Sequence, residues 1–205
     1  LCLQPSDHQR ALAGEPNLLR SCGRPLPGAE LKIVDEQGNS LAAGETGELL
    51  VRSSTTMQGY WQLPEKTAET IVDGWLHTGD AGYLDEDGFF YIRDRVKDMI
   101  VSGGENIYPA EVENALFSHP AIQDVAVIGV PDIKFGEAAL AVCVLKAGEA
   151  VEGDALIEFC KTRLAGYKTP RQYTFVQELP RNPSGKVLKR ILREPYWENT
   201  ERQVG

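Results

Sequence analysis

The sequence predicts an α+β fold, with a small antiparallel β unit followed by a compact α+β domain that has a small sheet and flanking helices. Alternating polar and apolar residues separated by turn-forming glycines fill much of the first half of the chain. From residue 98 onward, the segments follow the order strand, helix, two strands, helix, strand, helix. The 205 residues are 42% hydrophobic and 25% charged, an ordinary globular composition. We place the domain boundary at Lys97, which gives domains of residues 1–96 and 97–205.

The first domain is expected to consist mainly of β structure. Residues 1–28 are rich in Pro and Gly and have little periodicity, so no regular element is expected there. Pro64 stands at a first helical position and predicts a short helix over residues 64–71. The expected strands are residues 30–35, 47–52, 82–84 and 89–92. The last two are joined by Asp-Glu-Asp-Gly, which is typical of a hairpin turn.

The second domain is expected to contain buried strands. Residues 138–145 form the longest apolar run of the chain, eight residues, whereas a membrane-spanning helix needs about 20. Asp154 is expected to cap a helix, and residues 102–104 to form a flexible loop. The expected strands are residues 97–101, 125–130, 138–145 and 172–177. The expected helices are residues 109–119, 154–164 and 187–193.

Charge is distributed unevenly along the chain. The net charge of −9 disfavours a general nucleic-acid-binding protein, whose domains are basic. Residues 98–160 hold two basic and eleven acidic side chains, whereas residues 161–205 hold ten basic and four acidic ones. A basic segment of this kind suits a polyphosphate ligand. A solvated basic helix face explains it equally well.

The four cysteines and three histidines are scattered, without the spacing of metal ligands, so we expect no metal site among them. Cys143 and Cys160 lie in apolar segments and are expected to be core residues. No secretory signal pattern precedes the fold. We therefore expect a reducing compartment, the cytoplasm.

Several familiar catalytic motifs are absent from the sequence. It contains no G-x-S-x-G, no H-E-x-x-H, and no G-x-G-x-x-G after a strand. Gly185-Lys186 is not part of a nucleotide-binding P-loop. Pro180 stands where that loop needs its first glycine, and Val187 stands where it needs Ser or Thr.

One segment of the first domain and one at the domain boundary contain residue types suited to binding a ribose or a phosphate. In GWLHTGD, residues 74–80, Asp80 follows a glycine on an expected tight turn and could accept hydrogen bonds from two adjacent hydroxyls. In RDRVKD, residues 93–98, the arginines offer a fork of donors for hydroxyls or phosphate. A turn-stabilising aspartate and a surface ladder of salt bridges are the alternatives.

Two glycine-containing segments of the second domain could meet a ligand, the first through its exposed backbone and the second through a lysine. Gly103 and Gly104 lie in SGGENIYP, residues 102–109, where glycines would let another molecule approach the backbone. In LPRNPSGK, residues 179–186, two prolines stiffen a loop that ends on Lys186. A lysine ammonium suits a carboxylate or a phosphate. A plain loop and an exposed lysine explain the same residues, so each segment alone is weak.

Taken together and in this order, the four segments resemble the adenylate-forming superfamily, and within it the acyl-CoA synthetases, which are AMP-forming acid–CoA ligases. The matching sequences are GWLHTGD, DRVKDMI, GGENIYP and PRNPSGKVLKR, and GRPLPG at residues 23–28 also fits. Family members extend several hundred residues further at the N-terminus. The resemblance therefore implies that residues 1–96 are the last β subdomain of a large adenylating domain, and that residues 97–205 are a mobile C-terminal domain.

The resemblance implies a reaction in two steps. A carboxylic acid, such as a fatty acid, attacks the α-phosphate of ATP to give an acyl-adenylate and pyrophosphate. The thiol of CoA then displaces AMP and forms a thioester. Between the steps, the small domain rotates about a hinge. The sites for Mg²⁺, for most of ATP and for the acyl group are expected upstream of this sequence.

Roles for individual residues follow from the same resemblance. Asp80 should bind the ribose hydroxyls with the help of Arg95, and Lys97 should lie at the hinge. Lys186 should contact the acid carboxylate and the α-phosphate in the first step. The glycines at 103 and 104 should line the path of pantetheine in the second step.

Other interpretations of the chain remain open. The CoA phosphates could meet the basic segment through Lys168 or Arg171. The acceptor could be a carrier protein, as in peptide-synthetase modules, or the enzyme could be luciferase-like, although the GGENIYP sequence favours CoA ligases. The chain alone could also be a folded fragment without activity of its own.

Overall fold

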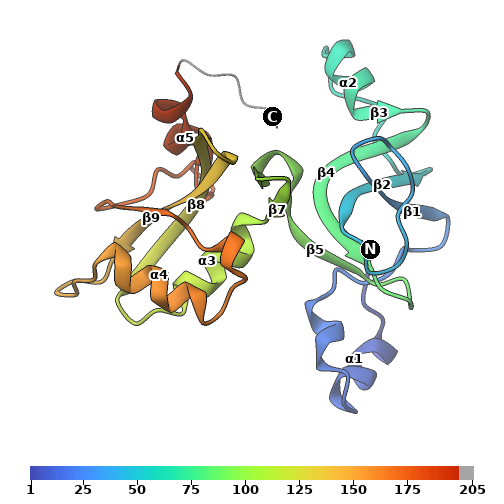
Figure 1. Cartoon of the computed structure of the whole chain (residues 1–205). Coiled ribbons are helices and arrows are strands. Elements are labelled where there is room, and N and C mark those ends of the chain that lie inside the picture. Colours follow the sequence, from blue (N-terminus) through green and yellow to red (C-terminus); the bar gives the residue numbers. More distant parts are fainter. Residues whose placement is uncertain (199–205) are drawn as a thin grey trace. The chain divides into compact units, whose positions relative to one another are not determined.

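The computed structural model describes residues 1–198, and Figure 1 shows its helices and strands along the chain. The chain divides into two compact units, Leu1–Val96 and Lys97–Gly205. The predicted α+β fold is confirmed, because each unit combines its own mainly antiparallel sheet with short helices. No helix among the described residues is long and apolar enough to cross a bilayer.

The first unit is built on a five-stranded sheet in the order β1-β2-β4-β3, with β5 added to β4. Its strands are β1 (Ala29–Val34), β2 (Gly47–Ser53), β3 (Ile71–Val72), β4 (Trp75–Leu84) and β5 (Phe90–Arg95). The long strand β4 is the centre of the sheet, because it pairs antiparallel with β2, β3 and β5. Helix α2 (Pro64–Thr70) begins at Pro64, as predicted.

Two short helices precede this sheet, α1 (Pro5–Leu12) and η1 (Pro16–Arg20), so the expectation of no regular element there was wrong. Prolines fit the first turn of a helix, because the N–H they lack would have no partner there. Asp7 accepts the Gln4 N–H at 2.7 Å, and Arg24 pairs with the same carboxylate at 3.0 Å. The start of α1 is thus tied to the chain that follows it.

Phe89 and Phe90 belong to two different clusters of the first unit. Phe90 packs with Ile33 and Leu49 of the sheet. Phe89 packs with Ala11 of α1 and with Leu18 of η1. Phe89 directly precedes β5 and Phe90 is its first residue, and consecutive residues of extended chain point to opposite sides. This pair therefore attaches the helices to one face of the sheet while it fills the core on the other.

The second unit holds a five-stranded sheet in the order β10-β9-β6-β7, with β8 paired to β9. Its strands are β6 (Ile100–Ser102), β7 (Glu105–Ile107), β8 (Ile122–Asp132), β9 (Gly136–Leu145) and β10 (Gln172–Phe175). Strand β10 runs parallel to β9, and the other pairs are antiparallel. The helices are α3 (Pro109–Phe117), α4 (Gly153–Lys161) and α5 (Lys189–Trp197), with 3-10 turns η2 (Val96–Asp98) and η3 (Gly166–Lys168).

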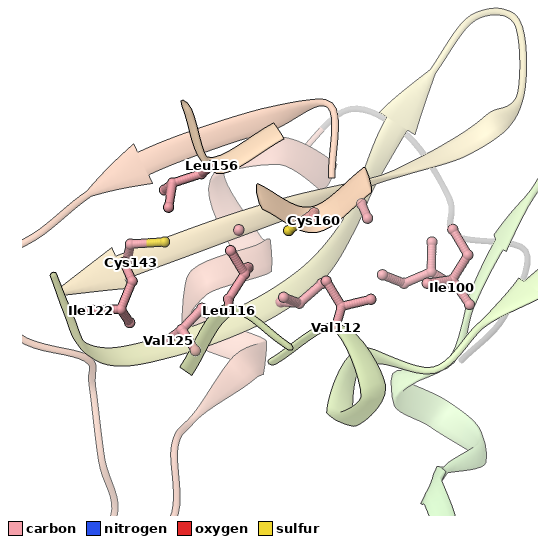
Figure 2. Packing of buried hydrophobic residues seen from close by; sticks show 12 residues of the cluster. Ile100, Val112, Leu116, Ile122, Val125, Cys143, Leu156 and Cys160 are labelled. Atoms are coloured by element: carbon pink, nitrogen blue, oxygen red, sulfur yellow. The ribbon is translucent and has the colours of Figure 1, made fainter. Parts of the chain in front are cut away.

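Side chains of β8 and β9 alternate between two cores. Figure 2 shows the core under α3 and α4, where Leu116 and Leu156 meet Val125 of β8. The intervening strand residues, such as Ile128, belong to the second core with Leu192 of α5. Burial on both faces explains why these strands are continuous apolar runs rather than alternating ones. Free cysteines at positions 143 and 160 are buried in the first core, as predicted.

Three details of the second unit differ from the sequence expectations. The expected loop over residues 102–104 is instead the end of β6 at Ser102 and the two-residue turn of the β6–β7 hairpin at Gly103 and Gly104. Glu152 holds the N-cap position of α4, so Asp154 lies in the first turn and is not the cap. Helix α5 begins later than expected, and Lys186 lies in the loop that precedes it.

Candidate functional site

Asp80 lies inside strand β4, not on the tight turn that the sequence predicted. The register shows why a glycine precedes it. Leu50 pairs with His77 and Glu48 with Ala81, so β4 has three residues where β2 has one. Gly79 adopts a φ of +70° within this bulge, a conformation that favours glycine. The bulge thus changes the direction of the strand just before the candidate carboxylate.

Glu48 of β2 holds this bulge in place. Its Oε1 accepts the Gly79 N–H at 3.0 Å, and its Oε2 lies 2.9 Å from Nδ1 of His77. Thr78 adds a second connection, because its hydroxyl donates to the Leu49 carbonyl at 2.8 Å and accepts the Asp80 N–H at 3.1 Å. Sequence reasoning missed Glu48, although a conformationally special glycine opposite a strand glutamate could have pointed to it.

Asp80 and Arg95 are brought together across β4 and β5. They are direct partners in the register, and Arg95 Nε lies 3.1 Å from Asp80 Oδ1. The carboxylate is 30% exposed and the guanidinium side chain 52% exposed. A carboxylate oriented by an arginine and open to solvent can accept hydrogen bonds from vicinal hydroxyls.

Lys97 lies in η2, at the first position of the second unit. The guanidinium of Arg193, on α5, donates to the Lys97 carbonyl oxygen at 3.2 Å and pairs with Asp98 at 3.1 Å. Both side chains of this ion pair are largely buried, with 15% and 14% of their surface exposed. The backbone after Lys97 is therefore attached to the second unit by its last described helix.

Gly103 and Gly104 form the turn between β6 and β7, with φ values of +63° and +85°. Gly103 donates its N–H to the Phe135 carbonyl at 2.8 Å, and a Cβ at position 103 would lie 2.9 Å from the Phe135 ring. A Cβ at position 104 would meet nothing within 4 Å. Packing within the chain therefore explains the first glycine, and the turn conformation explains the second.

The basic side chains near this turn differ in their availability. Lys168 is 19% exposed and bonds both carboxylate oxygens of Glu111, at 2.8 and 2.7 Å. Arg171 is exposed, and its guanidinium stacks on the Phe135 ring at 3.9 Å from the ring centroid. Of the two cations considered for the CoA phosphates, Arg171 is thus the one that solvent reaches readily.

Lys186 lies on an exposed loop that is closed on itself by hydrogen bonds. Its N–H donates to Asn182 Oδ1 at 2.9 Å, and its carbonyl accepts the Asn182 N–H at 2.9 Å. The base of the loop is closed by an isolated bridge between Arg181 and Val187. No other residue among positions 1–198 hydrogen bonds or pairs with the Lys186 ammonium. This cation is therefore presented to solvent on an ordered loop.

The structure brings Asp80 and Arg95 together, but it keeps the candidates of the second unit apart. The Lys186 loop is fixed through Arg181 to Asp124 near the start of β8, whereas Gly103 bonds Phe135 in the turn after the end of that strand. The ribose-type pair of Asp80 and Arg95 belongs to the first unit, and the second unit carries Lys186 and the glycine turn. Within residues 1–198, no cluster of three or more histidine, cysteine or acidic side chains could hold a metal ion.

Two family models match the chain. Residues 8–61 match the model described as AMP-binding enzyme. Residues 111–186 match the model described as AMP-binding enzyme C-terminal domain, and this range ends on Lys186.

Curated relatives match the chain over nearly its whole length. A fatty acid–[acyl-carrier-protein] ligase, ScoC, of Streptomyces coeruleorubidus is 45% identical over 100% of this chain and 38% of its own length. A long-chain-fatty-acid–CoA ligase of Bacillus subtilis is 48% identical over 95% of this chain and 35% of its own length. The chain therefore spans well under half the length of these relatives.

Solved structures extend the comparison to the fold. The o-succinylbenzoate CoA synthetase of Bacillus subtilis, in complex with an acyl-adenylate intermediate, aligns with a TM-score of 0.81 and 40% identity. The alignment covers 93% of this chain and 37% of that one. The amide bond synthetase McbA of Marinactinospora thermotolerans aligns with a TM-score of 0.79 and 40% identity over 95% of this chain and 39% of its own.

Proposed function

This chain belongs to the adenylate-forming superfamily of AMP-binding enzymes, and we propose that it is the C-terminal part of an AMP-forming acyl-CoA synthetase. The proposed enzyme activates a carboxylic acid, a fatty acid in the first instance, with ATP and transfers the acyl group from the acyl-adenylate to CoA. The 48% identity to a long-chain-fatty-acid–CoA ligase, over 95% of this chain, supports a fatty acid as the substrate class.

One observation carries the proposal, the exposed and unpaired ammonium of Lys186. Two other lysines of the basic segment, Lys168 and Lys189, are each held in an ion pair on their own unit at 2.7 Å. A cation without a neutralising neighbour can stabilise the negative charge that develops on a carboxylate and an α-phosphate. We therefore assign Lys186 as the catalytic residue of acyl-adenylate formation.

The other candidate residues receive matching roles. Asp80, oriented by Arg95, accepts hydrogen bonds from the ribose hydroxyls of the nucleotide. Residues 1–96 form the last part of the adenylating domain, and residues 97–205 form a mobile domain whose hinge is Lys97. The hairpin turn at residues 103–104 lines the path of the CoA thiol in the second step.

The support for each proposed co-substrate and cofactor differs. ATP use is supported by the family and by relatives crystallised with ATP or an acyl-adenylate. For CoA, the exposed guanidinium of Arg171 offers a donor to the phosphates. Mg²⁺ is proposed to be held by residues upstream of this chain, as the family resemblance implies. The cytoplasmic location stays a prediction.

A second candidate function differs only in the acceptor of the acyl group. The relative named as an acyl-carrier-protein ligase matches all of this chain at 45% identity. The thiol of a carrier protein would then replace the thiol of CoA, and the first step would be unchanged.

The acceptor is tested with the full-length enzyme that contains this chain. AMP release is followed with ATP, Mg²⁺ and a panel of carboxylic acids, each alone, with CoA, and with a thiol-bearing acyl carrier protein. Turnover that needs both an acid and CoA supports the proposed ligase. Turnover that needs the carrier protein instead supports the second candidate. Residues 1–205 alone should release no AMP.

The role of Lys186 is tested by substitution. Lys186→Ala should lower acyl-adenylate formation by about 10²-fold or more, the cost of losing one charge-stabilising group. Arg190→Ala is a matched control, because Arg190 is an exposed cation four residues later that pairs only loosely with Glu194, at 3.6 Å. Acyl-adenylate formation at the normal rate by Lys186→Ala would refute the assignment.

A further inference from the structure

We propose that Asn182 is the positioning residue for Lys186, because its side chain closes the loop that presents the ammonium. This inference rests on the proposed function, in which Lys186 acts during adenylation. Asn182 itself touches no substrate in this proposal. It acts through the backbone of residues 182–186.

The geometry around Asn182 supports this role. Its Oδ1 accepts hydrogen bonds from the Ser184 N–H at 3.1 Å, the Ser184 hydroxyl at 2.8 Å and the Lys186 N–H at 2.9 Å. Its backbone N–H donates to the Lys186 carbonyl at 2.9 Å, and its carbonyl accepts the Gly185 N–H at 2.9 Å. One residue thus binds the backbone of Lys186 on both sides of its Cα.

The chemistry of the asparagine side chain suits this task. A short amide oxygen reaches backbone N–H groups a few residues ahead and imitates a backbone turn. Gly185 completes the loop with a φ of +83°, a conformation that glycine adopts without steric cost. The turn therefore depends on Asn182 as acceptor and on Gly185 for its shape.

The base of the loop is fixed to the sheet of the same unit. One guanidinium N–H of Arg181 donates to the Gly185 carbonyl oxygen, and the other terminal nitrogen pairs with Asp124 of β8. The Leu188 N–H donates to the Pro180 carbonyl at 2.8 Å, which joins the two limbs of the loop. Motion of the loop as a whole is thereby restricted, and its tip is shaped by Asn182.

The chain after the loop is anchored as well. Lys189 at the start of α5 pairs with Glu113 of α3 at 2.7 Å, and their side chains are 15% and 22% exposed. The same Glu113 oxygen accepts the Val127 N–H at 2.8 Å. Of the two lysines in GKVLK, the second therefore has a structural role. Only Lys186 lies between the two anchors with its ammonium in solvent.

The test compares the two half-reactions in the full-length enzyme. Asn182→Ala should lower the kcat of acyl-adenylate formation by about 10- to 100-fold, because a small misplacement of a reacting group has effects of this order. The KM for ATP should change less than about twofold, since the substitution removes no substrate contact. Thioester formation from supplied acyl-adenylate and CoA should keep its normal rate, because Lys186 acts only in the first step.

Two further variants separate positioning from a general loss of structure. Asn182→Thr keeps an uncharged acceptor that can close a similar turn, so it should recover most of the adenylation rate. Arg190→Ala should behave as the unsubstituted enzyme in both half-reactions. Equal losses in both half-reactions for Asn182→Ala, or no recovery with Asn182→Thr, would overturn the proposal.

A measurement on the chain of 205 residues is independent of the catalytic role. Amide hydrogen exchange at the Lys186 N–H should accelerate at least about tenfold in Asn182→Ala, because its acceptor is gone. Unchanged exchange would overturn the positioning role even if catalysis fell. If Lys186→Ala has normal adenylation, the proposed function fails. If Lys186→Ala is impaired but Asn182→Ala is not, only the positioning role fails.

Discussion

Arg193 binds both the carbonyl oxygen of Lys97, at 3.2 Å, and the carboxylate of Asp98, at 3.1 Å. The last described helix of the second unit therefore holds the first residues of that unit. If the small domain rotates about Lys97, this contact confines the rotation to the backbone that precedes Asp98. The contact gives the proposed hinge a defined end.

The first prediction concerns this contact. Arg193→Ala leaves Asp98 with little exposure and without its cation, so the free energy of unfolding should fall by about 2 kcal/mol. Urea unfolding measures this loss. Trypsin cleavage after Lys97 should also become faster, because the backbone there loses its anchor. Arg190→Ala, the exposed control, should change the free energy of unfolding by less than about 0.5 kcal/mol. An equal loss in both variants would contradict the prediction.

The second prediction concerns the bulge that carries Asp80. Glu48→Ala removes the acceptor of the Gly79 N–H and the partner of His77, so it should lower the free energy of unfolding by about 1–2 kcal/mol. In the full-length enzyme, it should also weaken AMP binding, because the bulge sets the direction of Asp80. Isothermal titration with AMP measures this effect.

Glu30→Ala is the control for the bulge. Glu30 is on the same sheet, is 60% exposed, and pairs with the exposed Arg52 at 2.6 Å. It should leave AMP binding unchanged and cost about 1 kcal/mol of stability at most. Normal AMP binding by Glu48→Ala would show that the bulge does not position Asp80.

The parts of the fold that the sequence predicted are those where local pattern and burial agree. The apolar runs of β8 and β9 predicted buried strands correctly, because both faces of these strands are covered. Asp80 was misplaced on a turn, because the glycine at 79 serves a bulge inside a strand. A single sequence does not show which strand lies opposite, so it cannot distinguish these two uses of glycine.

The residues of the candidate site also divide into those that the sequence indicated and those that only the fold shows. The order of the four segments and the family resemblance single out Lys186, because its loop alone is explained equally well by an exposed lysine. The contacts of Glu48 with Gly79 and of Arg193 with Lys97 join residues 31 and 96 positions apart. Such pairs depend on the tertiary fold, and nothing in the local sequence indicates them.

The third prediction separates the two glycines of the hairpin turn. Gly103→Ala and Gly104→Ala should each lower stability by about 1 kcal/mol, because both positions have positive φ. Gly103→Ala should lose a further amount of about 1–3 kcal/mol, since its Cβ would lie 2.9 Å from Phe135. Thermal unfolding measures the difference. Gly148→Ala is the control, with a φ of +81° and open space around its Cβ. Equal losses at 103 and 104 would show that the Phe135 ring moves aside freely.

The fourth prediction is a loss of stability at alkaline pH that starts in the core of the second unit. Burial raises the pKa of the Cys143 thiol from 9.0 to about 12, and burial also raises the pKa of Tyr173. The thiol keeps its proton in the folded protein at pH values where it loses the proton in the unfolded protein. The stabilisation that the protonated thiol gives to the folded state is therefore complete below about pH 9. That contribution is lost progressively as the pH rises toward 12, the pKa of the folded state.

The size and direction of this change in the free energy of unfolding are measured by urea unfolding at pH 8, 9, 10 and 11. Between the two pKa values, one such group lowers the free energy of unfolding by about 1.4 kcal/mol per pH unit. Cys143→Ala should therefore be less stable at pH 8, where it leaves a small cavity, and should lose stability less steeply above pH 9. Cys22→Ala removes an exposed thiol instead and should keep the steep slope. The quantity compared is the change in the free energy of unfolding per pH unit within each variant, so the cavity in Cys143→Ala does not affect it. Equal slopes for the two variants would contradict the assignment to Cys143.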